Sequence, residues 1–161
     1  MFSPIHHTKR KSPRAPIASL AQVAVGLDRY PATVSQISEG GLRLETDREL
    51  PKARLVVAFD LPGFGAQRVL GEVCWQRNLP TSRGYGCAFK ELAPATQLNI
   101  TSYVKKMKQV CTDLQLAIAL NKPRSAWDKL AREVGIGFLI DRTEIKQFLS
   151  RAMEQLQSAN R

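Results

Sequence analysis

Long hydrophobic runs are missing from this sequence, and cysteine is scarce. No apolar stretch approaches the length of about 18 residues that a membrane-spanning helix needs, and Met1 is not followed by a hydrophobic segment of the signal-peptide type. The three cysteines, Cys74, Cys87 and Cys111, are an odd number without C-x-x-C spacing. We therefore expect a cytoplasmic protein without membrane insertion, in which the cysteines are small buried side chains in a reducing compartment.

Groups that would support catalysis or metal binding are also few. His6 and His7 are the only histidines, and two adjacent imidazoles without further ligands do not make a metal site. The carboxylates form no obvious pair, and neither G-x-S-x-G nor P-loop spacing occurs. The sequence therefore predicts a protein that is not an enzyme and that carries no metal and no cofactor.

Positive charge, by contrast, is plentiful. The 161 residues include 24 Lys and Arg against 14 Asp and Glu, which gives a formal net charge of +10. Such a balance favours an anionic partner, whether a nucleotide, a nucleic acid, an acidic protein or a membrane surface. Residues 1–92 hold 13 basic and 8 acidic side chains and residues 93–161 hold 11 and 6, so the excess is not confined to one tail.

Composition and periodicity divide the chain into four segments. Residues 1–16 contain three prolines and four Lys or Arg, which is typical of a flexible basic arm. Residues 17–92 show short runs of alternating apolar residues separated by turn residues, which predicts an all-β barrel or sandwich. A helical period follows, so we expect one long amphipathic helix in residues 93–121 and a C-terminal helical extension in residues 122–161.

We predict six antiparallel strands, so the expected fold class is mainly β with C-terminal α. The strands cover residues 17–25, 30–37, a stretch from Leu42, residues 54–61, residues 67–76 and a stretch that contains Tyr85, Cys87 and Phe89. In the fifth strand Val69, Val73 and Trp75 fall on one face. Aromatic side chains bury much area, so Trp75 and Phe89 are interpreted as core residues rather than as ligand-stacking residues.

The long helix carries an apolar seam at spacings of four and three residues. Its members are Ile100, Val104, Met107, Cys111, Leu114 and Ile118. The seam can pack within its own domain or support a dimeric coiled coil, so a homodimer through residues 96–120 stays open. Two shorter helices follow, the second with capping-box character at Asp141 and Glu144. Their apolar faces are Trp127, Leu130 and Val134 in the first and Ile145, Leu149, Ala152 and Leu156 in the second.

The arm ends in an R-x-x-x-R pair formed by Arg10 and Arg14. Alone the pair says little, because two arginines at this spacing occur easily by chance in an arginine-rich chain. The pair becomes informative because it lies just before the first predicted strand. Two guanidinium groups on a movable arm can fork onto phosphate oxygens and stack their flat faces on purine rings.

A second motif, Gln36-x-Ser38-x-x-Gly41, occupies the turn between the second and third strands. Gly40 and Gly41 allow positive φ values and the close approach of another group. The Ser38 hydroxyl can turn to a bound partner such as a phosphate, or to the amides of its own turn. An ordinary hairpin turn needs the same residue types, so the motif gains weight only together with the arginine pair.

Together the two motifs resemble the pattern of the PilZ domain family, whose members are receptors for the bacterial second messenger cyclic di-GMP. That pattern is R-x-x-x-R, then D-or-N-x-S-x-x-G, then the strands of a six-stranded barrel and a closing helix. Arg10, Arg14, Ser38 and Gly41 match, and the likeness extends over residues 9–105. The resemblance implies a non-catalytic sensor that clamps cyclic di-GMP between its arm and a PilZ-type barrel. It also implies an unidentified protein target in motility, secretion or polysaccharide synthesis.

One position departs from the family pattern. Gln36 stands where the family has Asp or Asn, and a glutamine reproduces the two hydrogen bonds of a carboxylate to a guanine edge less well. A degenerate adaptor that acts by protein contacts alone is therefore the alternative.

Binding to DNA through the C-terminal helices is a further alternative. Residues 130–135 resemble the first helix and the turn glycine of a helix-turn-helix. However, Asp141 stands where the next buried aliphatic residue is expected, and Ile145 comes four residues later. Because docking on DNA needs a fixed angle between the helices, nucleic acid is the less favoured partner.

Overall fold

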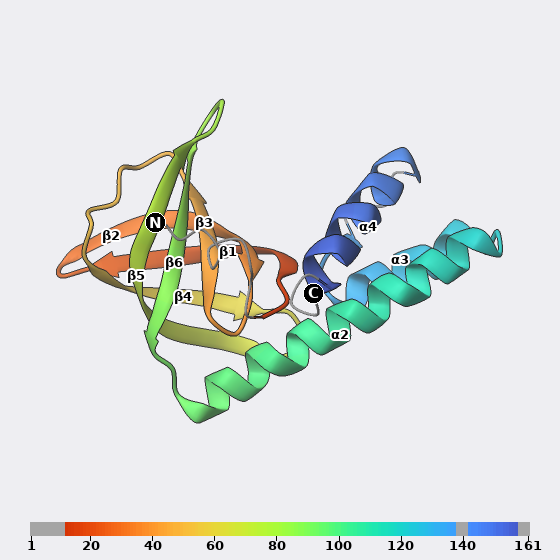
Figure 1. Ribbon diagram of the computed structural model, residues 1–161, viewed down its shortest axis with the longest axis horizontal. Coiled ribbons are helices and arrows are strands. Elements are labelled where there is room, and N and C mark those ends of the chain that lie inside the picture. The colour runs from red at the N-terminus through yellow and green to blue at the C-terminus, as the bar shows by residue number, and fades with distance from the viewer. Residues whose placement is uncertain (1–11, 138–141, 158–161) are drawn as a thin grey trace, which may run out of the picture.

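Alternating apolar residues form six strands that close into an antiparallel barrel (Figure 1). The computed structural model describes residues 12–137 and 142–157. The strands are β1 (Ala15–Val25), β2 (Asp28–Ile37), β3 (Gly41–Thr46), β4 (Arg54–Leu61), β5 (Gly65–Asn78) and β6 (Arg83–Glu91). In the described residues they are followed by the helices α2 (Pro94–Ala119), α3 (Arg124–Glu133) and α4 (Arg142–Gln157). The predicted fold class, a six-stranded barrel with one long and two shorter C-terminal helices, is confirmed.

The strands follow one another around the barrel in the order β1, β2, β3, β6, β5, β4, and β4 pairs with β1 to close it. Residues 47–53 carry the chain from β3 to β4, so β6 returns to lie between β3 and β5. Closure leaves no free sheet edge, which removes the unpaired main-chain groups that an open sheet would expose. The barrel begins slightly before the predicted first strand, because β1 starts at Ala15.

Alternate residues of each strand fill the barrel. Fully buried side chains include Val23, Val34, Leu44, Val57 and Tyr85. The Tyr85 hydroxyl accepts a hydrogen bond from the N–H of Leu50 at 3.0 Å and donates one to the carbonyl oxygen of Arg48 at 3.2 Å. These two bonds hold the connection between β3 and β4 against the core.

Strand β5 is irregular where it pairs with β6. The register shifts between Leu70 and Gly71 and again between Val73 and Trp75. An extra residue in one strand changes which face the following side chains occupy. Trp75 is 40% exposed, so the prediction that it is a core residue is wrong. Phe89 is half-buried and packs against the core.

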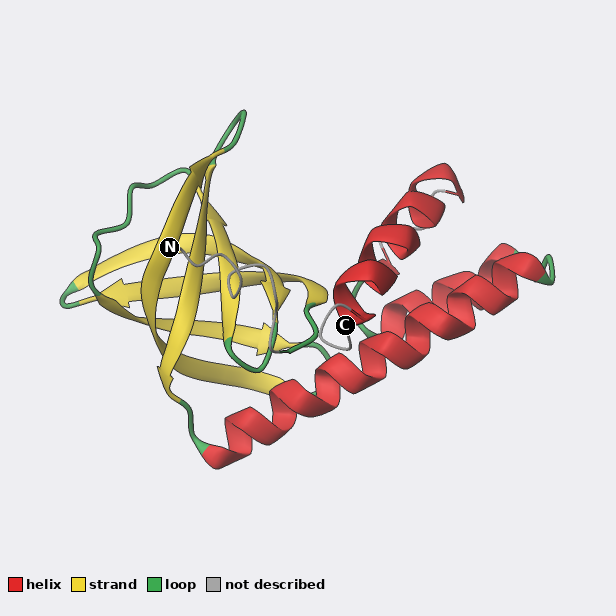
Figure 2. Cartoon of the chain, in the orientation of Figure 1, coloured by secondary structure: helices red, strands yellow, loops and turns green. Residues whose placement is uncertain are grey.

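Helix α2 begins with a proline at its first position and ends before Asn121, which adopts the left-handed conformation at φ 52°. The N–H of Lys122 donates to the carbonyl oxygen of Ala117 at 2.9 Å, a bond that closes many helix ends. Of the predicted seam residues, Ile100, Val104, Met107, Cys111 and Leu114 are buried, and Ile118 is half-buried. Figure 2 shows α2 passing along the barrel and continuing beyond it, where α3 and α4 lie against it. The seam therefore packs within one chain.

Helices α3 and α4 complete the helical part. Gly135, at φ 73°, ends α3, and the N–H of Ile136 donates to the carbonyl oxygen of Ala131 at 2.9 Å. A Cβ on Gly135 would lie 3.0 Å from Cγ of Pro62, so this turn lies against the connection between β4 and β5. Of the predicted lining residues, Leu130 is half-buried, and the others are buried, namely Trp127, Val134, Ile145, Leu149, Ala152 and Leu156. The expected capping residue Asp141 lies outside the described residues.

Within residues 12–137 and 142–157, no helix is both long enough and apolar enough to cross a membrane.

Candidate ligand-binding site

The pairing of β1 with β2 brings the end of the basic arm beside the second motif. The antiparallel register places Pro16 opposite Gln36, so Arg14 reaches the same edge of the barrel. Nη1 of Arg14 donates to Oε1 of Gln36 at 3.4 Å, and both side chains are half-buried. Two motif residues 22 positions apart in the sequence thus meet. Arg10 lies outside the described residues.

The turn at 38–41 satisfies its own polar groups. The N–H of Ser38 donates to the carbonyl oxygen of Gly41 at 2.9 Å, and Oγ of Ser38 accepts from the N–H of Gly40 at 3.3 Å. The carbonyl oxygen of Gly40 accepts from the N–H of Phe89 at 3.0 Å, which ties the turn to β6. Of the two roles expected for the Ser38 hydroxyl, the structure shows the bond to an amide of its own turn.

The glycines of this turn are not required for positive φ values. Neither Gly40 nor Gly41 has a positive φ, so that part of the expectation is wrong. A Cβ on Gly41 would clash with the carbonyl oxygen of Cys87, whereas a Cβ on Gly40 would meet nothing within 4 Å. Gly41 is therefore needed because β3 and β6 approach each other closely at this point.

Side chains on neighbouring strands form a row across the outside of the barrel. Gln36 on β2 pairs with Arg43 on β3, and Arg43 pairs with Gly86 on β6. Gly86 in turn pairs with Trp75 on β5. The residues on either side of Arg43 in β3 are buried, so the Arg43 side chain points outward. We call Gln36, Arg43 and Trp75 the outer row.

Two members of the outer row carry flat groups. Cζ of Arg43 lies 5.9 Å from the centroid of the Trp75 ring, within the range of cation–π contacts. The indole occupies the space beside Gly86, where a Cβ would clash with it. Nε of Arg43 also lies 3.7 Å from Oε2 of Glu45, and both side chains stay partly exposed. Ion pairs of this exposure hold their partners weakly, so the guanidinium can turn to a stronger anion.

The outer row contains two residues that were not among the predicted site residues. Arg43 stands between two leucines in an alternating run, so its outward direction could have been inferred from the sequence. Trp75 offered no such signal, because the same alternation, counted from Val69, placed it in the core. Only the register shift after Val73 turns it outward.

The buried thiols are not reactive groups. Burial, with a smaller contribution from Cys74, raises the pKa of Cys87 to about 12, and burial also raises the pKa of Cys111 to about 12. Both thiols therefore stay protonated near neutral pH. Cys74 is exposed, which corrects the expectation that all three cysteines are buried. In the part of the chain that the structure describes, no group of three or more His, Cys, Asp or Glu could hold a metal ion.

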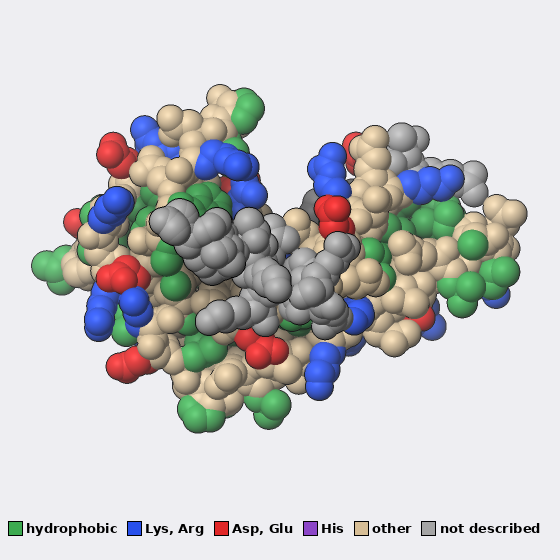
Figure 3. All heavy atoms as spheres, viewed as in Figure 1, with side chains coloured by type: hydrophobic (Ala, Val, Ile, Leu, Met, Phe, Trp, Pro, Cys, Tyr) green, Lys and Arg blue, Asp and Glu red, His purple; other side chains and the backbone are tan. Residues whose placement is uncertain are grey.

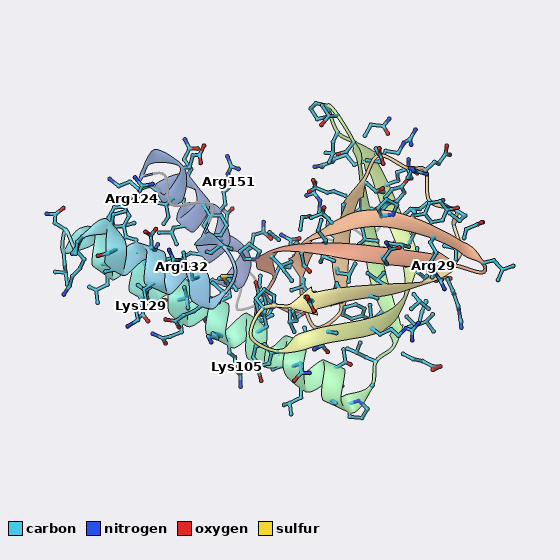
Figure 4. The ribbon with its side chains drawn as sticks, turned by 180° about the vertical axis from the view of Figure 1, so that it is seen from behind. Arg29, Lys105, Arg124, Lys129, Arg132 and Arg151 are labelled. Atoms are coloured by element: carbon cyan, nitrogen blue, oxygen red, sulfur yellow. The ribbon has the colours of Figure 1, made fainter. Side chains whose placement is uncertain are left out.

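Further positive charge lies on the helices. The space-filling view shows Lys and Arg over both the barrel and the helical part (Figure 3). Seen from behind, Arg29 lies at the end of the barrel that is remote from the helices (Figure 4). The labelled basic residues of the helical part are Lys105, Arg124, Lys129, Arg132 and Arg151, all exposed (Figure 4). Positive charge is thus distributed over the molecule rather than gathered at the outer row.

The C-terminal helices do not have the connection of a DNA-binding helix-turn-helix. Residues 134–141 separate α3 from α4, whereas a turn of about 3–4 residues joins the helices of that motif. A hollow of about 460 Å³ on α3 is lined by acidic as well as basic side chains. Its lining consists of Ser125, Asp128, Lys129, Arg132 and Glu133. This geometry gives the DNA alternative no support.

Comparison with known proteins adds a family and a set of similar folds. The model of the PilZ domain family matches residues 8–106, which is more than half of the chain. No curated protein matches the sequence. Among solved structures, the chain is similar to the inhibitor of motility MotI/DgrA from Bacillus subtilis, with 18% identity and a TM-score of 0.53. The match covers 63% of this chain and 54% of that chain.

Two structures of YcgR from Escherichia coli with cyclic di-GMP are also similar. The match to the YcgR complex has 12% identity, a TM-score of 0.60 and coverage of 68% of this chain and 50% of that chain. The match to the PilZ domain of YcgR has 10% identity, a TM-score of 0.54 and coverage of 71% and 98%. The chain therefore spans about half the length of MotI/DgrA and YcgR. At these identities the likeness shows the fold alone.

Proposed function

Because the chain belongs to the PilZ domain family, we propose that it is a non-catalytic receptor that binds cyclic di-GMP between its basic arm and the outside of its barrel. Cyclic di-GMP carries two phosphates and two purine rings, so a receptor must supply positive charge together with flat stacking surfaces. The two YcgR structures from Escherichia coli, which share the fold, contain this ligand. Binding would be relayed to a protein target.

The contact between Arg14 and Gln36 at one end of the outer row is the observation that most supports this proposal. Together with the strand pairing, this contact supports an arrangement in which Arg14, Gln36, Arg43 and Trp75 lie along one outer surface. Guanidinium groups bind phosphate oxygens in a fork geometry, and guanidinium and indole planes stack on purines. The surface thus offers both kinds of contact that the ligand needs.

Each residue of the surface has a role in the proposal. Arg14, together with Arg10 from the part of the arm outside the described residues, binds phosphate and stacks on a purine. Gln36 orients the Arg14 side chain and bonds a guanine edge. Arg43 and Trp75 stack on a purine on the outside of β3 and β5.

The turn that carries Ser38 and Gly41 is a rigid border of the site. Its internal hydrogen bonds and its attachment to β6 fix its shape without a ligand. The role of Ser38 in the proposal is to hold this shape, because its hydroxyl already bonds the turn. Gly41 lets β3 lie close enough to β6 for the outer row to be continuous.

The side chain at position 36 bears on whether the protein is a receptor or an adaptor that does not bind the nucleotide. A carboxylate at this position could pair with Arg14 and accept two hydrogen bonds from a guanine edge, whereas the amide of Gln36 has one acceptor oxygen. Its bond to Arg14 is long, at 3.4 Å. The proposal therefore includes weak binding in the natural sequence and stronger binding when a carboxylate is restored.

Calorimetric titration with cyclic di-GMP tests the proposal on the 161-residue chain and its variants. We expect the parent to bind, Arg14→Ala to lose measurable binding, and Gln36→Asp to bind at least as tightly as the parent. Each hydrogen bond to a charged group contributes about 1.5–3 kcal/mol, and Arg14→Ala removes more than one. Arg29→Ala is the matched control, because it removes an exposed arginine at the far end of the barrel (Figure 4).

Three other results would be informative. A parent and a Gln36→Asp variant that both fail to bind would contradict the receptor function. If the parent does not bind cyclic di-GMP but Gln36→Asp does, the chain is a receptor that has lost its ligand, which would support the adaptor alternative. Equal binding by the parent and Arg14→Ala would leave cyclic di-GMP as a ligand but place it elsewhere on the molecule.

A further inference from the structure

Hydrogen bonds from two helices reach the base of the basic arm. The backbone N–H of Arg14 donates to the carbonyl oxygen of Gln155, in the last turn of α4, at 3.2 Å. The hydroxyl of Tyr103 on α2 donates to the carbonyl oxygen of Pro16 at 2.9 Å. The same hydroxyl lies 3.4 Å from the carbonyl oxygen of Val134, directly after α3. The residues next to and within the first motif are thus attached to the C-terminal helices.

These contacts are well suited to fix the main chain at this point. The last carbonyl groups of a helix have no partner within the helix, and the N–H of Arg14 supplies one for α4. Tyr103 is fully buried, and burial raises its pKa well above the usual value, so its hydroxyl remains a donor near neutral pH. Ala15 follows Arg14 in the sequence and Leu156 follows Gln155, and both of these neighbours are also fully buried. Water therefore competes little for these bonds.

We infer that Tyr103 and the end of α4 position Arg14 for the ligand, so that the C-terminal helices are coupled to the proposed binding site. The inference rests on the proposed function. The main chain of Arg14 is held by Gln155, while its side chain reaches Gln36. Gln155 lies outside residues 8–106, to which the family model extends. The extension thus supplies support that the matched domain does not contain.

Coupling of this kind works in both directions. If docking of α4 holds Arg14 in the geometry that binds the ligand, the ligand must in turn stabilise the docked position of α4. The helical extension then changes its stability when cyclic di-GMP binds. This gives the receptor a means of presenting its bound state on the C-terminal helices.

The variant Tyr103→Phe tests the inference, because it removes one hydroxyl and keeps the ring. We expect its affinity for cyclic di-GMP to fall about fivefold or more, since a lost hydrogen bond of typical strength corresponds to that factor. Tyr85→Phe is the matched control. Tyr85 is also fully buried and its hydroxyl also bonds the main chain, but at Arg48 and Leu50, beyond the other end of β3. The affinity of Tyr85→Phe for cyclic di-GMP should equal that of the parent.

Hydrogen exchange provides a readout that a merely structural role would not change. In the parent, cyclic di-GMP should slow amide exchange at Arg14 and in the last turn of α4. In Tyr103→Phe, exchange at Arg14 should be faster without ligand, and the protection that the ligand gives to α4 should be smaller.

The outcomes separate this inference from the function on which it rests. Binding by the parent with equal or tighter binding by Tyr103→Phe would overturn the inference and leave the receptor function intact. Binding by the parent without any ligand-dependent protection of α4 would also overturn it. A parent that does not bind cyclic di-GMP would remove the receptor function and the inference together.

Discussion

The indole of Trp75 is exposed and lies beside an arginine, although tryptophan rings are usually well buried. It is 40% exposed and its ring centroid lies 5.9 Å from Cζ of Arg43. We predict that Trp75→Ala weakens binding of cyclic di-GMP about 5- to 150-fold, because stacking of a base on an aromatic ring contributes about 1–3 kcal/mol. The thermal unfolding midpoint should change little. Calorimetric titration and a melting curve measure the two effects.

Tryptophan fluorescence gives a second check on the same residue. The chain has two tryptophans, and the other, Trp127, is buried in the helical part. Ligand should therefore change the emission of Trp75, and Trp75→Phe should abolish this change while keeping part of the stacking affinity. Equal affinity of Trp75→Ala and the parent would show that the ligand does not use this end of the outer row.

At the scale of single residues, the sequence predicted which strands lie side by side better than it predicted which way a side chain faces. The meeting of Arg14 and Gln36 could be expected, because each motif borders a strand and successive strands usually pair. The direction of Trp75 could not, because it depends on one extra residue in β5, between Val73 and Trp75, that is defined only by pairing with β6. Alternation fixes the face of a side chain only as far as the nearest bulge.

The contact of β3 with β6 depends on one glycine. A Cβ on Gly41 would clash with the carbonyl oxygen of Cys87, and main-chain atoms cannot move aside as a flexible side chain can. We predict that Gly41→Ala lowers the free energy of unfolding by about 1–3 kcal/mol, which is typical of overpacking. Urea denaturation of the 161-residue chain measures this change.

Gly40→Ala is the matched control for the same turn. A Cβ there would meet nothing within 4 Å, and the backbone of Gly40 does not have a positive φ. The free energy of unfolding should therefore change by no more than about 0.5 kcal/mol, as for most surface positions. Similar losses in both variants would mean that flexibility of the turn, rather than the approach of β3 to β6, requires its glycines.

The elements themselves were largely predictable, because their period is a local property. Strand β4 spans the predicted residues 54–61, and the seam of α2 has the predicted spacing. The ends of β5 were less predictable. It extends to Asn78, beyond the predicted end at 76, where exposed polar residues show no alternation. Pairing with β6 rather than burial maintains this part of the strand.

At the scale of the whole molecule, α2 joins two parts that the sequence could not place relative to each other. Its apolar seam was compatible with packing inside the chain or with a coiled coil, because both need the same spacing. The structure shows contacts of α2 with β1 and β5 as well as with α3 and α4. One helix therefore carries contacts to the barrel, to the base of the arm and to the C-terminal extension.

Removal of the C-terminal extension should uncover the part of this seam that α3 and α4 cover. Met107, Cys111 and Leu114 are fully buried in the 161-residue chain, and an exposed apolar stripe on a helix favours association with another copy. We predict that a chain ending at Asn121 sediments as a larger species than its mass requires, in a concentration-dependent manner. Leu114→Glu in the truncated chain should restore the monomer, because a buried carboxylate opposes association. A monomeric truncated chain beside a dimeric 161-residue chain would contradict this and assign self-association to α3 and α4.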